Sequence, residues 1–267
     1  MPEPVIDDLT VTMPIIIIPV RREPREVLKI TSIIMLLTLI IAVSSAAIVG
    51  QYFGGQVSEE AMPAKESEMG SKASVLNLLY ILVMVIVVTM MVIALVKYGK
   101  LGLLKLFMTL SIVFLIVVFT QAMAILYQIY IVSFLWYKGL HGVALVIPYI
   151  VHISWALSIM FCGLYVLSII KMKYLNLRNA VLMLNAIWAA VWLGWSSGVL
   201  TPIVILIGLA IYDLYSVFKG PLRDLTELLV DRERRSEEGP EGVIIGLGDI
   251  FFYSFAIAYS YAVLSLI

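Results

Sequence analysis

The chain has 267 residues, of which 62% are hydrophobic and 13% charged, and its 18 basic and 18 acidic residues cancel. Its mean hydropathy of +1.06 excludes an ordinary soluble domain, and apolar runs of about 20 residues indicate helices that cross a membrane. One cysteine excludes an intrachain disulfide, and one thiol with two histidines is a poor metal-ligand set, so we expect neither metal nor cofactor.

Residues 1–29 are expected to form a cytosolic arm before the first span. The stretch MPEPVIDDLTVTMPIIIIPVRREPREVLK has acids ahead of its apolar segment and prolines on both sides of residues 15–18. It lacks the small-residue cleavage pattern of a signal peptide. We interpret it as a polar arm that contains one short segment favouring a β-strand.

Seven apolar segments predict an all-α fold, a polytopic bundle of transmembrane helices. The predicted spans are residues 30–50, 75–96, 103–126, 143–170, 180–197, 200–218 and 243–266. Residues 30–197 therefore hold spans one to five. Residues 198–267 hold spans six and seven with their connecting loop, residues 219–242.

Polar and aromatic residues inside the first five spans are given structural interpretations. Pro148 predicts a kink in the long fourth span. The remaining residues fall into two groups. We expect contacts between helices from the amides Asn77, Gln121, Gln128 and Asn185, and an aromatic belt at the exterior interface from Trp188, Trp192 and Trp195.

The basic residues predict the orientation of the chain. Fifteen of the 18 flank the spans on one side, in residues 21–29, 97–105, 171–178 and 219–235, whereas Lys65, Lys72 and Lys138 lie on the other. Since cytosolic loops carry the excess of Lys and Arg, the N-terminus and the 219–242 loop are predicted to be cytosolic.

Two carboxylates interrupt the last two predicted spans. No Asp or Glu occurs between Glu68 and Asp213, and the only other acid inside a span is Asp249. Asp213 lies six residues before Lys219, where span six leaves for the cytosol, and Asp249 lies six residues after Val243, where span seven returns. At 1.5 Å per helical residue, both lie about 9 Å below the same membrane face. Adjacent spans with matching acids predict a pair of carboxyl groups.

Paired carboxyls in a low-dielectric site cannot both ionise cheaply, so they hold one proton between them. That state suits peptide hydrolysis, because the carboxylate takes a proton from water and the acid donates one to the scissile carbonyl oxygen. Gly246 and Gly248 leave room for another backbone to approach just before Asp249. An extended peptide is able to pair with such an edge.

The strings YDLYSVFKGPL and GLGDIFFYS resemble the two active-site motifs of the presenilins, the GxGD class of intramembrane aspartyl proteases. The resemblance extends from about residue 30 to the end and includes LVKYGKLGLLKL between spans two and three. It implies that Asp213 and Asp249 are the catalytic pair. It also implies that Tyr212, Gly246, Leu247 and Gly248 contact the substrate. Residues 219–222 (KGPL) and 252–254 resemble presenilin more than signal peptide peptidase.

The resemblance also implies partners and defines the alternatives. Expected partners are single-span membrane proteins as substrates, the lipid bilayer, and either accessory membrane subunits or further copies of the chain. Presenilins have nine spans and a Pro-Ala-Leu tripeptide in the ninth, whereas this sequence shows seven spans and no such tripeptide. Two alternatives therefore stay open: a channel or transporter that uses the intramembrane acids, and a non-catalytic scaffold that binds helices.

Overall fold

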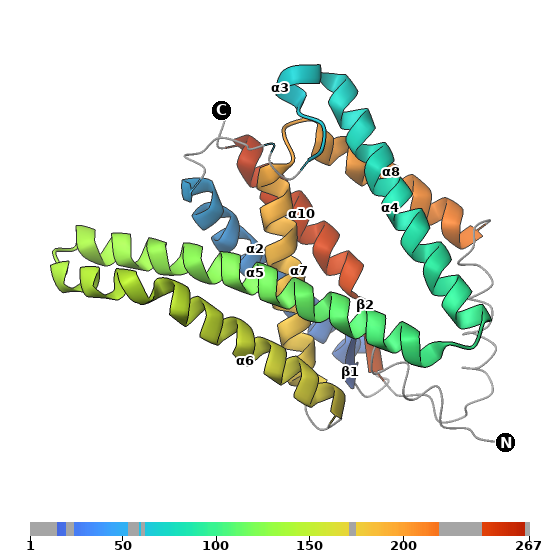
Figure 1. Ribbon diagram of the computed structural model, residues 1–267, viewed down its shortest axis with the longest axis horizontal. Helices are drawn as coiled ribbons and strands as arrows, with labels where there is room; N and C mark the ends of the chain where they lie inside the picture. The colour runs from blue at the N-terminus through green and yellow to red at the C-terminus, as the bar shows by residue number, and fades with distance from the viewer. Residues whose placement is uncertain are drawn as a thin grey trace.

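The computed structural model describes residues 15–19, 24–52, 59, 62–170, 175–218 and 242–264, and in them the chain forms a bundle of helices (Figure 1). Within this part, five segments are long and apolar enough to cross a membrane: Thr31–Gln51, Ser71–Leu95, Gly102–Tyr137, His141–Ile169 and Leu177–Ser196. Two further apolar helices, Thr201–Tyr212 and Gly248–Leu264, are shorter. The predicted membrane bundle is thereby confirmed at this level.

The elements follow the chain in the order expected, with one small sheet added. They are β1 (Ile15–Pro19), α2 (Pro24–Tyr52), α3 (Glu66–Met69), α4 (Ser71–Lys97), α5 (Leu101–Tyr137), the 3₁₀ helix η1 (His141–Tyr149), α6 (Ile150–Ile170), α7 (Leu175–Ser196), α8 (Thr201–Phe218), β2 (Gly242–Gly246) and α10 (Leu247–Leu264). Residues 219–241, which make up nearly all of the predicted cytosolic loop, lie outside the described residues.

Helix α7 is the centre of the bundle and packs on α2, α5, α6 and α10. Small residues allow these helices to approach closely. A Cβ atom on Gly194 of α7 would lie 3.0 Å from the Cβ atom of Ala258 in α10. A Cβ atom on Gly50 of α2 would lie only 2.6 Å from the ring of Trp195. Association through small residues and close van der Waals contact is typical of helices in lipid.

The tryptophans of α7 correct one sequence expectation. Trp195 is fully buried and Trp188 is 9% exposed, and both belong to the apolar core with residues of α2 and α10. They are therefore packing residues and not an aromatic belt. Helical spacing alone did not distinguish these two roles, since both place the rings on one face of the helix.

Helix α4 has the outer surface expected of a helix in lipid. Leu79, Val83, Val87 and Met90 are each more than half exposed. Its other side faces α8, and Figure 1 shows the two helices running side by side at one edge of the bundle. Apolar side chains on the outside favour a membrane as the surrounding medium.

Helix α5 is longer than the sequence predicted, since it continues past residue 126 to Tyr137. At 1.5 Å per residue, its 37 residues extend over about 55 Å, more than the hydrocarbon core of a bilayer. It runs beside α6 for much of its length (Figure 1). The predicted break at Pro148 is found at the end of η1, just before α6 begins.

The start of span seven also differs from the prediction. Val243 to Gly246 belong to β2, and α10 begins at Leu247. The run Val243–Ile244–Ile245 is β-branched and lies between two glycines, a combination that favours a strand over a helix. The predicted β-prone segment of the N-terminal arm is confirmed as β1, and it pairs antiparallel with β2.

Candidate active site

Asp249 lies in the first turn of α10, directly after the β2 strand. Gly246 ends the strand, Leu247 begins the helix, and Gly248 and Asp249 are exposed. A carboxylate in the first turn is favourable, because the free N–H groups and the helix dipole attract negative charge there. A Cβ atom on Gly248 would meet nothing within 4 Å. The backbone before Asp249 is therefore open to an approaching group.

Asp213 lies in the second half of α8, twelve residues after the helix begins at Thr201. The side chain of Tyr212 is half-buried, and that of Asp213 lies outside the described residues. The relative position of the two carboxyl groups is therefore inferred from the helices to which they belong.

Helices α8 and α10 meet at the end of the bundle opposite to these acids. The hydroxyl of Tyr259 in α10 donates a hydrogen bond of 2.7 Å to the carbonyl oxygen of Val199, just before α8. From there α8 packs mainly along α4, whereas α10 packs along α7 and α2. Figure 1 shows α8 and α10 leaving this end in different directions. The two helices are joined at one end and separate along their length.

The start of α8 is held by a carboxylate from the first residue of α3. Glu66 accepts hydrogen bonds from the amides of Val199 (3.0 Å), Leu200 (3.0 Å) and Thr201 (2.5 Å), and from the hydroxyls of Thr201 and Ser74. Burial raises the pKa of Glu66, but the hydrogen bonds from Leu200, Thr201 and Ser74 outweigh it and hold this pKa below its ordinary value. A charged cap on the free N–H groups fixes α8 to the loop before α4.

Asn77 reinforces the same junction from α4. Its amide group exchanges two hydrogen bonds with the backbone of Ala64, of 3.0 and 2.8 Å, and donates a third, of 3.3 Å, to the hydroxyl of Thr201. The prediction that Asn77 makes contacts between segments is confirmed. Gly208 of α8 packs so tightly on Leu78 that an added Cβ atom would overlap the leucine side chain. Helices α4 and α8 therefore form one closely joined pair.

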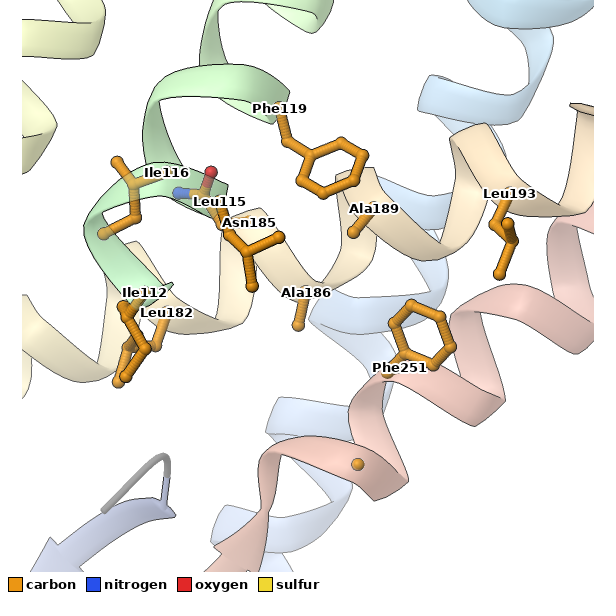
Figure 2. Close-up of a pocket in the computed structure, with 11 residues that line it drawn as sticks. Ile112, Leu115, Ile116, Phe119, Leu182, Asn185, Ala186, Ala189, Leu193 and Phe251 are labelled. Atoms are coloured by element: carbon orange, nitrogen blue, oxygen red, sulfur yellow. The ribbon is translucent and has the colours of Figure 1, made fainter. Parts of the chain in front are cut away.

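A cavity of about 470 Å³ opens between α5, α7 and α10 beside the start of α10 (Figure 2). Gly248, the residue before Asp249, lines its wall. Figure 2 shows Phe251 of α10 facing Ala186 and Ala189 of α7. The remaining lining residues come from α5 and α7 and are apolar except Asn185; they are Ile112, Leu115, Ile116, Phe119, Leu182 and Leu193.

Asn185 does not offer a free polar group to this cavity. The Thr120 hydroxyl donates to its carbonyl oxygen at 3.1 Å, and its NH₂ group donates to the Val181 carbonyl at 2.9 Å. Gln128 likewise bonds to Ser154 of α6 at 2.8 Å. Asn185 and Gln128 are thus contacts between helices, as predicted. The cavity suits an apolar side chain or chain segment.

The structure brings some of the predicted site residues together and leaves others apart. Gly248 and Asp249 lie next to the apolar cavity at the start of α10. Tyr212 and Asp213 lie on α8, which follows α4 away from α10. Within the described ranges, no group of three or more His, Cys, Asp or Glu residues lies close enough to hold a metal ion.

Two features of this region were not predicted from the sequence. Glu66 belongs to no recognised sequence motif. The signal that could have indicated the cap is a glutamate in the segment before α4, together with Thr201 at the start of a helix. The pairing of the N-terminal arm with β2 was also missed, because strand preference identifies a strand and not its partner. Comparison of the sequence with family models and with curated proteins found no match.

Proposed function

We propose that the protein is an intramembrane aspartyl endopeptidase that cleaves peptide bonds in transmembrane helices. The observation that carries the proposal is the sequence pair Tyr212–Asp213 and Gly246–Leu247–Gly248–Asp249, with the resemblance to the presenilin motifs. Two lone acids in consecutive apolar helices are costly in lipid, and such residues are usually functional.

The mechanism follows from a pair of carboxyls that share one proton. The carboxylate takes a proton from a water molecule, whose oxygen bonds to the carbonyl carbon, while the carboxylic acid gives its proton to the carbonyl oxygen. The C–N bond of the resulting tetrahedral intermediate then breaks as the nitrogen is protonated. The proton belongs to the pair of Asp213 and Asp249, so neither is assigned a fixed role.

The helix geometry supports a site that assembles by closure. Asp249 lies ten residues before Tyr259, and Asp213 lies twelve residues after Thr201, which is about 15 and 18 Å along the two helices. Both acids are therefore at comparable distances from the junction at Val199. Rotation of the α4–α8 pair about that junction would bring them to one level, a hinge movement of the kind that assembles many active sites.

The cavity beside Asp249 supports an apolar substrate. Its lining of aliphatic and aromatic side chains suits residues of an unwound membrane helix. An ion path would instead need polar or charged lining groups. This contrast favours the hydrolase over the channel or transporter.

The topology completes the proposal. Helices α8 and α10 are the sixth and seventh spans, with the N-terminus and residues 219–242 in the cytosol. In that orientation both aspartates lie near the cytosolic face, and water reaches them from that side. Substrates are single-span membrane proteins that enter from the bilayer, with accessory subunits or further copies of the chain as additional partners.

Replacement of Asp213 and of Asp249 by Ala or Asn, one at a time, tests the proposal. The purified full chain is reconstituted in vesicles with a labelled single-span substrate, and peptide products are identified by mass. Each variant is expected to lose cleavage by at least a thousandfold, whereas the control Tyr149→Phe, at a 60% exposed position outside both motifs, keeps it. Full activity of either aspartate variant would overturn the assignment.

Inhibition separates the hydrolase from the two alternatives. A peptide mimic with a hydroxyl group in place of the scissile carbonyl should bind far more tightly than the substrate, because it resembles the transition state. A channel would ignore it and pass ions. A scaffold would bind the substrate helix without releasing a peptide product.

A further inference from the structure

The N-terminal arm of this chain occupies the strand that leads into the proposed site. Strand β1 pairs antiparallel with β2 in a fixed register, with Ile15 opposite Gly246, Ile17 opposite Ile244 and Pro19 opposite Gly242. Gly246 lies only three residues before Asp249. A segment from the start of the chain therefore reaches the backbone next to a catalytic candidate near its end.

This pairing uses backbone groups that an extended peptide would need. A strand edge binds a peptide by main-chain hydrogen bonds, and each edge accepts one partner at a time. Within the described residues, the sheet has two strands, so the edge of β2 that faces β1 is paired, while its other edge has no strand partner. An incoming segment gains that edge only when β1 leaves.

We propose that β1 is an autoinhibitory segment, which holds the edge of β2 that it faces and prevents a substrate strand from pairing with that edge beside Asp249. The inference rests on the proposed function and adds its regulation. The arm belongs to the same molecule. A short connection joins it to α2, which begins at Pro24. Such a tether gives it an effective concentration on the order of millimolar.

The sequence of the arm suits an occupant that resembles a substrate. Residues 15–18 are four isoleucines, as apolar as an unwound segment of a membrane helix. The ladder is short, since Pro14 precedes it and Pro19 ends it, and a proline has no N–H group to donate. A two-stranded pairing of five residues is marginal in stability. The arm is therefore able to exchange with a competing strand.

A reversible cross-link tests the proposal on the full chain. Ile17→Cys and Ile244→Cys are introduced together in a Cys162→Ala background, because directly opposite residues have Cβ atoms about 4.5–5.5 Å apart. Oxidation should join the two cysteines. It should lower cleavage of a limiting substrate at least tenfold, and a reducing agent should restore it. The Ile17→Cys single variant is the control and should respond to neither treatment.

Disruption of the strand should have the opposite effect. Ile16→Pro and Ile17→Pro are combined, because successive N–H groups of a strand point to opposite sides and one of the two must belong to the ladder. If β1 occupies the edge nine-tenths of the time, its release raises cleavage about tenfold. The conservative pair Ile16→Val and Ile17→Val should leave the rate unchanged.

A binding measurement separates failure of this inference from failure of the proposed function. The probe is a fluorescent peptide of residues 12–20, added to the double-cysteine protein. It should bind the reduced form and not the cross-linked form. Absence of the cross-link, equal and measurable cleavage in both states, or equal peptide binding in both states would overturn autoinhibition. A different result would be peptide binding that depends on the redox state with no product formed in either state. That result would support the occupation of the β2 edge by β1. It would refute the hydrolase proposal, and with it the regulation of cleavage.

Discussion

The hydroxyl of Tyr259 donates a hydrogen bond to the carbonyl oxygen of Val199 and so joins α10 to the start of α8. This side-chain hydrogen bond joins the two segments of the chain that carry Asp213 and Asp249. Away from it, α8 follows α4 and α10 follows α7. A rotation of the two helices about this junction would change the separation of the two aspartates.

Loss of that bond is expected to weaken catalysis more than folding. Tyr259→Phe removes the donor and keeps the ring, so the free energy of unfolding should fall by only about 0.5–1.5 kcal/mol. Cleavage should fall by at least threefold, because the two helices lose their common pivot. Rates in vesicles and thermal unfolding in detergent measure the two effects. Tyr149→Phe, the same change at an exposed position outside both motifs, is the control, and equal behaviour of the two variants would remove the pivot from the mechanism.

The cap formed by Glu66 predicts a dependence of stability on pH. Its pKa is lowered in the folded protein, so the carboxylate stabilises the fold fully above the ordinary value of 4.5. That contribution is lost as the pH falls below 4.5 and through the folded pKa. Thermal unfolding between pH 3 and pH 7 should therefore show a decline at the acid end that Glu66→Gln reduces. Glu68→Gln, on the exposed side of α3, should leave the decline unchanged.

Replacement of Glu66 by Ala should also loosen the start of α8 at neutral pH. The loss of several hydrogen bonds to a charged group, reduced by solvent screening, is expected to cost about 1–2 kcal/mol of unfolding free energy. Hydrogen exchange at Val199, Leu200 and Thr201 reports the effect locally. Protection at these three amides equal to that of the unmodified chain would contradict the cap.

The bundle could be predicted from the sequence because hydropathy and helix length have a direct physical basis in lipid. Five of the seven predicted spans correspond to segments long and apolar enough to cross a membrane, and the last two correspond to shorter apolar helices. The predicted ends of the spans were less accurate than the spans themselves. Span three was predicted to end at residue 126, but α5 continues to Tyr137, and Gln128 in this extension donates a hydrogen bond to Ser154 of α6.

The candidate site could be predicted only in part. The acids and the glycines before Asp249 were evident, since charge is rare in spans and glycine has distinctive backbone freedom. The cap from Glu66 and the strand partner of residues 15–18 depend on which segments meet in space. A single sequence shows which secondary structure each segment prefers, but it does not show which other segment it will contact.

The apolar cavity predicts a selective effect of Ala189→Phe. The new ring would fill space between α7 and α10 beside Phe251, where substrate side chains are proposed to bind. Cleavage of substrates with large apolar residues at the scissile bond should fall about tenfold or more, mostly through KM, whereas substrates with alanine there should be affected less. Ala180→Phe makes the same change at an exposed position of α7 and is the control. Equal losses for large and small substrates would indicate a general disturbance of the bundle.

The contact between α7 and α10 predicts a graded response at Gly194. An added Cβ atom would lie 3.0 Å from the Cβ atom of Ala258 and 3.3 Å from the carbonyl oxygen of Phe255. Gly194→Ala should therefore be tolerated with a small shift of α10. Gly194→Leu forces the helices apart and is expected to cost about 1–3 kcal/mol, as overpacking of tight cores does. Because α10 carries Asp249 toward its other end, cleavage should decline in the same order.

Gly163 of α6 is the control for this series, since a Cβ atom there meets nothing within 4 Å. Gly163→Leu should leave both unfolding and cleavage close to those of the unmodified chain. Thermal unfolding in detergent and cleavage in vesicles are measured for all three variants. If Gly194→Leu were as stable and as active as Gly163→Leu, α10 would not pack on α7 through Gly194, and the position of Asp249 beside the cavity would lose its structural basis.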